Sequence, residues 1–431
     1  MVARDSLITL FTRLLTSLLA FVGNIILARL LGASGMGIWA VIVSFLALVI
    51  HLCGPGISFA NVYYVAQKKQ TPGQAWAATL LLGFGFGALG ILTGGVLVLL
   101  KFKSLANIAD MRLVLLILVA IPLMYISTWG SRIIQGMDRI SLMNLLDVIS
   151  QLAYLCLLVF FVWILKWKLW GAITAFIGWH LSAVIALSVT LAILMRPGEF
   201  RLSWKSARSS VIYGFKMYMG KVSNWANNRI DMLIAPIFLQ SAQIGQYAVA
   251  VAVVEKLWMF PDALSQAVFP KVSADAKGRP ELTAQACRVS LIVMLPIALI
   301  LASVGWWFFP FLFGPEYKGS YILMAAILPG TLAFGISRIL TVGMAGINRP
   351  ATLSGVVAVS AAVNIALNFL MIPRLGVLGC SLASTGSYTF EMILLIWCHC
   401  RYHQVNPLSL VNIKFSDLTM VIEQGKRSFC R

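Results

Sequence analysis

The stretch that decides the fold runs from Ser6 to Leu30 and reads SLITLFTRLLTSLLAFVGNIILARL. About 20 mostly apolar residues are what one helix needs to cross the hydrocarbon core of a bilayer. The run is too long for the apolar core of a signal peptide, and no small-residue cleavage site precedes Arg29. We therefore expect it to stay in the protein as a first transmembrane helix.

Apolar runs of the same kind continue to about residue 400. Of the 431 residues, 60% are hydrophobic and only 11% are charged, and the mean hydropathy is +0.91, far from the balance of a water-soluble domain. Pro, Gly and charged residues divide the runs into about twelve helices. Their predicted spans are 6–30, 37–66, 74–100, 111–135, 140–165, 169–195, 211–238, 243–270, 284–313, 320–346, 350–373 and 376–400. The sequence thus predicts an all-α integral membrane protein.

Basic residues indicate how these helices lie in the membrane. Lys and Arg are more frequent in every second connection, for example at Lys68 and Lys69 and again at Arg201. Short basic loops stay on the cytoplasmic side, and an even number of spans puts both termini together, so we expect both termini in the cytoplasm. Much of the formal net charge of +19 then reflects topology, and nucleic acid is not needed as a partner.

An internal repeat divides the chain into two halves of six helices. The segment Gly32–Val41, after the first helix, aligns with Gln240–Val249, after the seventh, and this pairs Gly37 with Gly245. Halves of the same orientation form parallel repeats about an axis along the membrane normal, with a central cleft between the two bundles. The second helix of each half is interrupted, by Gly54-Pro55-Gly56 and by Pro261.

The predicted domains follow from this division. They are an N-terminal six-helix bundle (1–200), a cytoplasmic linker (201–210), a C-terminal six-helix bundle (211–403) and a cytoplasmic C-terminal tail (404–431).

Charged residues within the spans are the main functional signal, because each costs about 2.5–3.5 kcal/mol at mid-bilayer. The embedded cations are Arg13, Arg29, Arg132, Lys216, Lys221, Arg229, Lys256, Arg288 and Arg338, and the embedded acids are Asp147, Asp231, Glu255, Asp262 and Glu391. Cations near helix ends, such as Arg29, can extend to the interface. The remaining excess of positive charge predicts an anionic cargo.

Polar residues recur at helical spacing in three helices. The first helix carries Thr9, Arg13, Thr16, Ser17 and Asn24, the seventh carries Lys221, Asn224, Asn228 and Asp231 with Arg229 and Trp225 beside them, and the eighth carries Glu255, Asp262 and Gln266. Shorter stripes contain Asn144, Asp147 and Gln151, and Ser360, Asn364 and Asn368. We expect a hydrated lumen, with interhelical hydrogen bonding as the alternative.

The sequence contains no convincing motif for catalysis or for cofactor binding. Gly85–Gly90 fits the GxGxxG pattern but lies inside an apolar helix, where small residues favour helix packing. There is no Walker A sequence, no HExxH pair and no CxxC pair, and the seven cysteines are scattered. We therefore expect a transporter rather than an enzyme, with no cofactor and no metal.

Several short motifs resemble one family. Leu27–Gly32 (LARLLG) with Gly35-Met-Gly37, Asn228-Arg-Ile-Asp231, and Phe269-Pro-Lys-Val-Ser273 look like landmarks of Wzx-type polysaccharide flippases in the MOP exporter superfamily. The resemblance implies a MOP/MATE-like fold. It also implies a flippase that moves undecaprenyl-pyrophosphate-linked oligosaccharide across the bacterial cytoplasmic (inner) membrane by alternating access, for O-antigen, capsule or exopolysaccharide biosynthesis.

The resemblance and the charge pattern together assign roles to residues. The expected substrate contacts are Arg13, Lys221 and Arg229 to phosphate, Trp225 to sugar, and Asn224, Asn228 and Arg338 around them. The residues expected to couple an ion or to pair charges are Asp231, Glu255, Lys256 and Asp262. The expected partners are the lipid-linked oligosaccharide, membrane lipids, H⁺ or Na⁺ as coupling ion, and a polysaccharide polymerase.

Three alternatives stay open. A lipid II flippase of the same superfamily usually has fourteen helices, and a MATE-like multidrug antiporter predicts an acid-rich cleft. A membrane-embedded polysaccharide polymerase would need a large outer loop, whereas the predicted outer loops are short.

Overall fold

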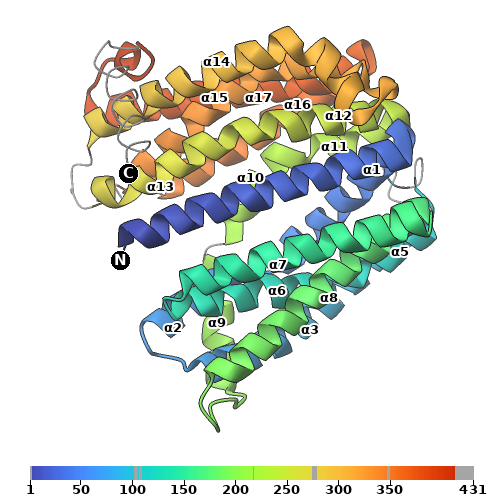
Figure 1. The fold of residues 1–431 in the computed structure, drawn as a ribbon. Helices are drawn as coiled ribbons and strands as arrows, with labels where there is room; N and C mark the ends of the chain where they lie inside the picture. The colour runs from blue at the N-terminus through green and yellow to red at the C-terminus, as the bar shows by residue number, and fades with distance from the viewer. Residues whose placement is uncertain are drawn as a thin grey trace. The chain divides into compact units, whose positions relative to one another are not determined.

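In a computed structural model, the chain forms helices throughout the described residues, which are 2–100, 105, 109–216, 218–273, 279–346 and 350–412, with no strand among them (Figure 1). The predicted tail beyond residue 412, and the side chains of Lys221 and Asn224, lie outside the described residues. The chain divides into two compact units, and each is described by itself. Unit 1 comprises Met1–Val222 and Gln240–Gly245, and unit 2 comprises Ser223–Leu239 and Gln246–Arg431.

The helices of unit 1 follow the predicted spans. They are α1 (Val2–Cys53), α2 (Ile57–Ala66), α3 (Pro72–Leu99), α5 (Met111–Leu118), α6 (Ala120–Gly136), α7 (Ile140–Leu158) with a π-helical turn (Val159–Ile164), α8 (Lys168–Leu194), α9 (Trp204–Lys216) and the start of α10 (Tyr218–Arg229). The first and second predicted helices join without a loop at Gly32, whose φ of 67° favours glycine. The helix α9 begins inside the predicted linker.

Unit 2 contains the remaining helices and several short turns. They are α11 (Asp231–Ile234), α12 (Ser241–Val254), α13 (Met259–Ser273), α14 (Pro280–Phe313), α15 (Ser320–Gly346), α16 (Pro350–Leu375) and α17 (Val377–His403), with 3₁₀ turns at Ala235–Ile237, Glu255–Trp258, Pro315–Tyr317 and Pro407–Leu410. Within this unit α15 and α17 pack side by side, as do α16 and α17 (Figure 1).

Eight of the described helices are long and apolar enough to cross a membrane, and one of them, Phe11–Cys53, merges the first predicted span with the start of the second. The predicted seventh and eighth spans are divided by turns into α9–α11 and α12–α13. Both predicted interruptions are confirmed, because α1 ends at Cys53 before Gly54-Pro55-Gly56, and a 3₁₀ turn precedes the α13 residue Pro261. The prediction of an all-α membrane protein is confirmed.

A reciprocal contact inside unit 1 supports the repeat. A Cβ atom on Gly37 would collide with the carbonyl oxygen of Ser241, and a Cβ atom on Gly245 would collide with that of Ala33. The alignment that pairs Gly37 with Gly245 also pairs Ala33 with Ser241. The segments around Gly37 and Gly245 therefore make the same contact with each other. Both positions need a glycine because the two backbones lie too close together for a Cβ atom.

Small residues pack the helices, as expected for the apolar GxGxxG segment. On α3, Cβ atoms at Gly87 and Gly90 would meet Pro122 and Ile121 of α6. A capping box between Thr71 and Gln74 begins α3. The glycine pattern therefore serves close helix packing.

Each unit has its own apolar core. In unit 1, the buried residues Trp76, Ile126, Ile133 and Leu187 belong to one cluster. In unit 2, the buried residues Cys287, Ile339, Leu340 and Leu395 belong to another.

Candidate functional site

The break between α10 and α11 carries the strongest concentration of predicted site residues in unit 2. Arg229 is the last residue of α10, Ile230 forms the turn, and Asp231 is the first residue of α11. The break therefore separates two oppositely charged side chains that lie only two residues apart in the sequence.

Arg229 forms an ion pair with Glu255. Its Nη2 atom lies 2.8 Å from Oε2 of Glu255, and the two side chains are 39% and 20% exposed. Glu255 begins the 3₁₀ turn between α12 and α13, and Lys256 in the same turn interacts electrostatically with both charges. The interruption of the eighth predicted span thus places an acid against a cation of the seventh.

Asp231 is buried, with 4% of the residue exposed, and its carboxylate accepts several hydrogen bonds. The Tyr247 hydroxyl donates to Oδ2, Ser384 Oγ donates to the same atom at 3.4 Å, and the backbone N–H of Met232 donates to Oδ1 at 2.8 Å. These donors replace the hydration that a buried carboxylate loses.

Arg338 lies on α15 and pairs with Asp262 of α13. Its guanidinium carbon lies 4.8 Å from the ring centroid of Trp258 and 5.0 Å from that of Phe334. Arginine is suited to this site because its planar fork stacks on aromatic rings and binds a carboxylate at the same time.

Glu391 belongs with these residues, although the predicted site did not include it. Asn227 Nδ2 donates to its carboxylate, and the charge of Arg338 acts on it. Glu391 is 3% exposed. Its presence as a single acid in an apolar helix was the available signal, but only the fold shows that α17 brings it to α10.

The polar stripe of α16 makes one hydrogen bond to α17 and another within α16. Asn364 Nδ2 donates to Ser387 Oγ of α17 at 2.7 Å, and Asn368 Nδ2 donates to Asn364 Oδ1 of the same helix at 2.9 Å. Both asparagines are essentially unexposed. For this stripe, the interhelical alternative describes the contacts that are present.

Unit 1 holds Arg13 in a different setting. Arg13 lies exposed on α1, and its charge acts on the exposed Asp147 of α7, as does the charge of Arg132 of α6. The helices α1 and α7 pack against each other. Arg13 is therefore an exposed cation near an acid on the surface of unit 1.

The structure brings some predicted residues together and separates others. Arg229, Glu255 and Lys256 interact, Arg338 and Asp262 interact, and Asp231 has its own hydrogen-bond partners. Arg13 lies in unit 1. Trp225 is buried at 8% exposure, and Asn228 is partly exposed on the same helix.

Chains of known structure share this fold. The lipid II flippase MurJ, in an inward closed conformation, matches with a TM-score of 0.75 at 15% identity, over 97% of this chain and 92% of that one. A multidrug resistance MATE family transporter of the MOP superfamily matches with a TM-score of 0.71 at 15% identity, over 93% and 98%. The fold is therefore that of the multi-pass transporters of the MOP superfamily.

Proteins with similar sequences indicate which kind of transporter this chain is. A probable low-salt glycan biosynthesis flippase of Haloferax volcanii is 24% identical over 96% of this chain and 85% of its own length. A proposed O-antigen transporter of Shigella flexneri is 20% identical over 93% and 98%. The family model described as polysaccharide biosynthesis protein matches residues 2–276, more than half of the chain. The chain belongs to this family, and it is a flippase-class transporter rather than an enzyme.

Proposed function

We propose that this chain moves an undecaprenyl-pyrophosphate-linked oligosaccharide from the inner to the outer leaflet of the cytoplasmic membrane by alternating access. Membership of the polysaccharide biosynthesis family supports a glycan-linked cargo. The relatives named as a glycan biosynthesis flippase and an O-antigen transporter support the same class of cargo. The product is used for O-antigen, capsule or exopolysaccharide, with a polysaccharide polymerase as the next partner.

The distribution of embedded charge carries the proposal. Of the charged residues predicted within or at the edges of spans, unit 1 has five cations and one acid, Asp147, whereas unit 2 has four cations and four acids. The whole excess of positive charge therefore belongs to unit 1. A pyrophosphate binds best where cations outnumber acids. A cation that is already paired with a carboxylate would have to give up that ion pair before it could bind the phosphate.

This difference ranks the expected phosphate contacts. Arg13 and Lys221 belong to the unit with the excess, so we assign them the pyrophosphate. Arg229 is paired with Glu255, so it contacts phosphate only if the anion competes with that carboxylate. Trp225 is buried, so stacking on a sugar requires α10 to move, and Asn224 and Asn228 would then offer amides to the same sugar.

The acids of unit 2 suit coupling to H⁺ or Na⁺. Asp231 accepts hydrogen bonds from Tyr247 and Ser384, so a bound ion would have to displace these donors. Glu255 and Asp262 are held by arginines, and a proton on either carboxylate would weaken its ion pair. Protonation during transport would then weaken the ion pairs that join α10 to the Glu255 turn and α13 to α15 within unit 2.

A MATE-like multidrug antiporter is the second candidate. Its support is the group of four acids in unit 2, since an acid-rich region suits organic cations, together with the MATE-like fold. A lipid II flippase shares the fold and the anionic cargo, and differs in the sugars.

The test is deletion of the gene in its host, followed by complementation. We expect lipid-linked oligosaccharide to accumulate in the inner leaflet, and wild-type chain to restore export. Arg13→Ala and Lys221→Ala should each lower export at least about tenfold at equal protein level, as expected for loss of a charged contact. Arg139→Ala, which removes an exposed cation of unit 1 outside the predicted spans, is the control and should export normally.

Other outcomes decide between the candidates. An unchanged inner-leaflet pool together with reduced dye efflux would favour the antiporter. Accumulation of lipid II alone would favour the lipid II flippase. Normal export by both alanine variants would remove Arg13 and Lys221 from the site.

A further inference from the structure

The helix α9 is firmly attached to unit 1 through one of its faces. Gln70 Nε2 donates to the Ser206 carbonyl at 3.3 Å and to Ser209 Oγ at 3.2 Å. Further along the helix, the ring of Tyr213 stacks on that of Tyr63 at 5.0 Å, with the planes 18° apart. The face of α9 that contacts α2 and the α2–α3 turn is therefore fixed in place.

The opposite face of α9, with the residues just before it, is exposed and combines two kinds of side chain. The apolar ones are Phe200, Leu202, Trp204, Ile212 and Phe215, which are 55%, 51%, 73%, 49% and 53% exposed. The basic ones are Arg201, Lys205 and Arg208, which are also exposed. Among the described residues, none of these three cations forms an ion pair with an acid. We call these eight residues the α9 face.

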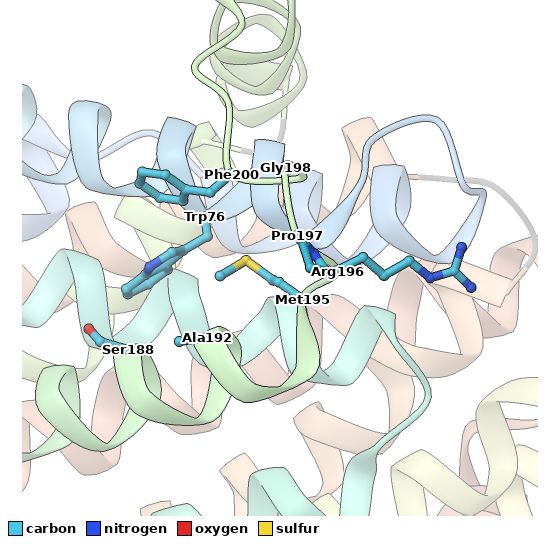
Figure 2. A pocket seen from close by; sticks show the side chains of 8 residues that line it. All are labelled: Trp76, Ser188, Ala192, Met195, Arg196, Pro197, Gly198 and Phe200. Carbon is cyan, nitrogen blue, oxygen red and sulfur yellow. The ribbon is translucent and has the colours of Figure 1, made fainter.

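A groove of about 460 Å³ opens beside the α9 face, where α8 ends (Figure 2). Its lining includes Trp76 of α3, Ala192 of α8, Met195 and Phe200. In Figure 2 the side chains of Trp76, Met195 and Phe200 lie close together, whereas the Arg196 guanidinium extends away from them. The groove therefore has an apolar part formed by these three side chains, and its size is within the range of sites that hold small molecules.

Gly73 allows the chain segment that forms this groove to lie against α3. A Cβ atom at Gly73 would meet the backbone of Glu199 and the nitrogen of Phe200 at under 3 Å. Residues 199 and 200 therefore rest directly on the first turn of α3. The groove and the α9 face are one continuous, preformed surface of unit 1.

We propose that this surface binds an anionic phospholipid of the surrounding bilayer, with an acyl chain in the groove and the phosphate against Arg201, Lys205 and Arg208. Exposed aromatic and aliphatic side chains beside these three cations match the chemistry of a lipid that has an apolar tail and a negative headgroup. A neutral lipid leaves the three cations unused, and a water-soluble acidic protein leaves the groove empty. The surface includes neither Arg13 nor Lys221, the two residues assigned to the pyrophosphate, so it is not the proposed cargo site.

The test is a titration of the purified full chain in detergent with phosphatidylglycerol, followed by native mass spectrometry. Phosphatidylcholine is the neutral comparison. We expect tighter binding of phosphatidylglycerol by the wild type, and a Kd at least about tenfold weaker in Lys205→Gln/Arg208→Gln, since each basic residue near an anionic lipid contributes about fivefold. Phosphatidylcholine binding should not change.

The matched control removes two other exposed lysines of unit 1. Lys166→Gln/Lys168→Gln also changes two cations next to an exposed tryptophan, Trp167, but at a surface with no such groove described. It should bind phosphatidylglycerol like the wild type. A second variant, Ala192→Trp, fills the groove without changing charge and should weaken phosphatidylglycerol binding severalfold.

Several outcomes would overturn the proposal. One is equal loss of binding in both lysine-containing double variants, which would show a non-specific effect of charge. Another is wild-type binding by both Lys205→Gln/Arg208→Gln and Ala192→Trp. A third is binding of undecaprenyl pyrophosphate at this surface without any binding of phosphatidylglycerol, which would make the surface a cargo site. Circular dichroism and the melting temperature confirm that each variant is folded.

Discussion

Unit 1 and unit 2 share backbone features at equivalent positions, but their embedded charged side chains have different interaction partners. Each has its second helix broken near the same point of the repeat, at Gly54-Pro55-Gly56 and before Pro261. Unit 1 leaves Arg13 exposed near an exposed acid, whereas unit 2 holds Arg229 and Arg338 in ion pairs. A duplicated framework can thus keep similar backbone breaks while the charged side chains in its two copies have different surroundings.

The largest expected effect tests what the two repeats share. Gly37→Ala and Gly245→Ala should each destabilise the protein by about 3 kcal/mol, because a new Cβ atom would press on a backbone carbonyl that cannot rotate away. The melting temperature measures this effect. Because the contact is reciprocal, the two losses should be similar, and Gly85→Ala is the control, since nothing lies within 4 Å of the place its Cβ atom would take. Unequal losses of stability in the two variants would show that the Gly37 and Gly245 contacts are not equivalent.

The next effect tests the difference in charge. Glu255→Gln should cost about 2 kcal/mol of stability, because it leaves Arg229 without its carboxylate in a site that is only partly exposed. Asp147→Asn in unit 1 should cost little, because Asp147 is exposed. Thermal unfolding of the two variants gives the comparison.

A double variant separates the ion pair from other contacts of Glu255. Arg229→Gln/Glu255→Gln should lose less stability than the sum of the two single variants, since neither charge is then left alone. Strict additivity would show that the pair contributes nothing, and the contrast between the units would then lose its main support.

The smallest effect concerns Arg338. Arg338→Lys keeps the charge near Asp262 but loses the planar contact with Trp258 and Phe334, so we expect a loss of about 1 kcal/mol in thermal unfolding. Arg338→Gln, which also removes the charge, should lose more. An equal effect of the two substitutions would assign the contribution to the aromatic stack alone.

Part of the candidate site was predictable from spacing. The seventh predicted span placed Arg229 near Asp231, and the eighth placed Glu255 in an acidic stripe, so both residues were candidates before any fold was known. Their pairing across helices was not predictable, because helical periodicity says which residues share a face but not which face another helix meets. Asn227 and Tyr247 were missed as site residues for the same reason.

The sequence by itself determined that the chain is helical and membrane-spanning, and it located the apolar spans approximately. It also predicted an internal repeat and an excess of cations over acids within the spans. These follow from local rules, because apolar length, helical period and proline breaks act within one segment. Only the tertiary structure decided which cations are neutralised and which acid, Glu391, joins them. A charge pair depends on distances of a few ångströms between segments far apart in the chain, and those distances exist only after the helices have packed.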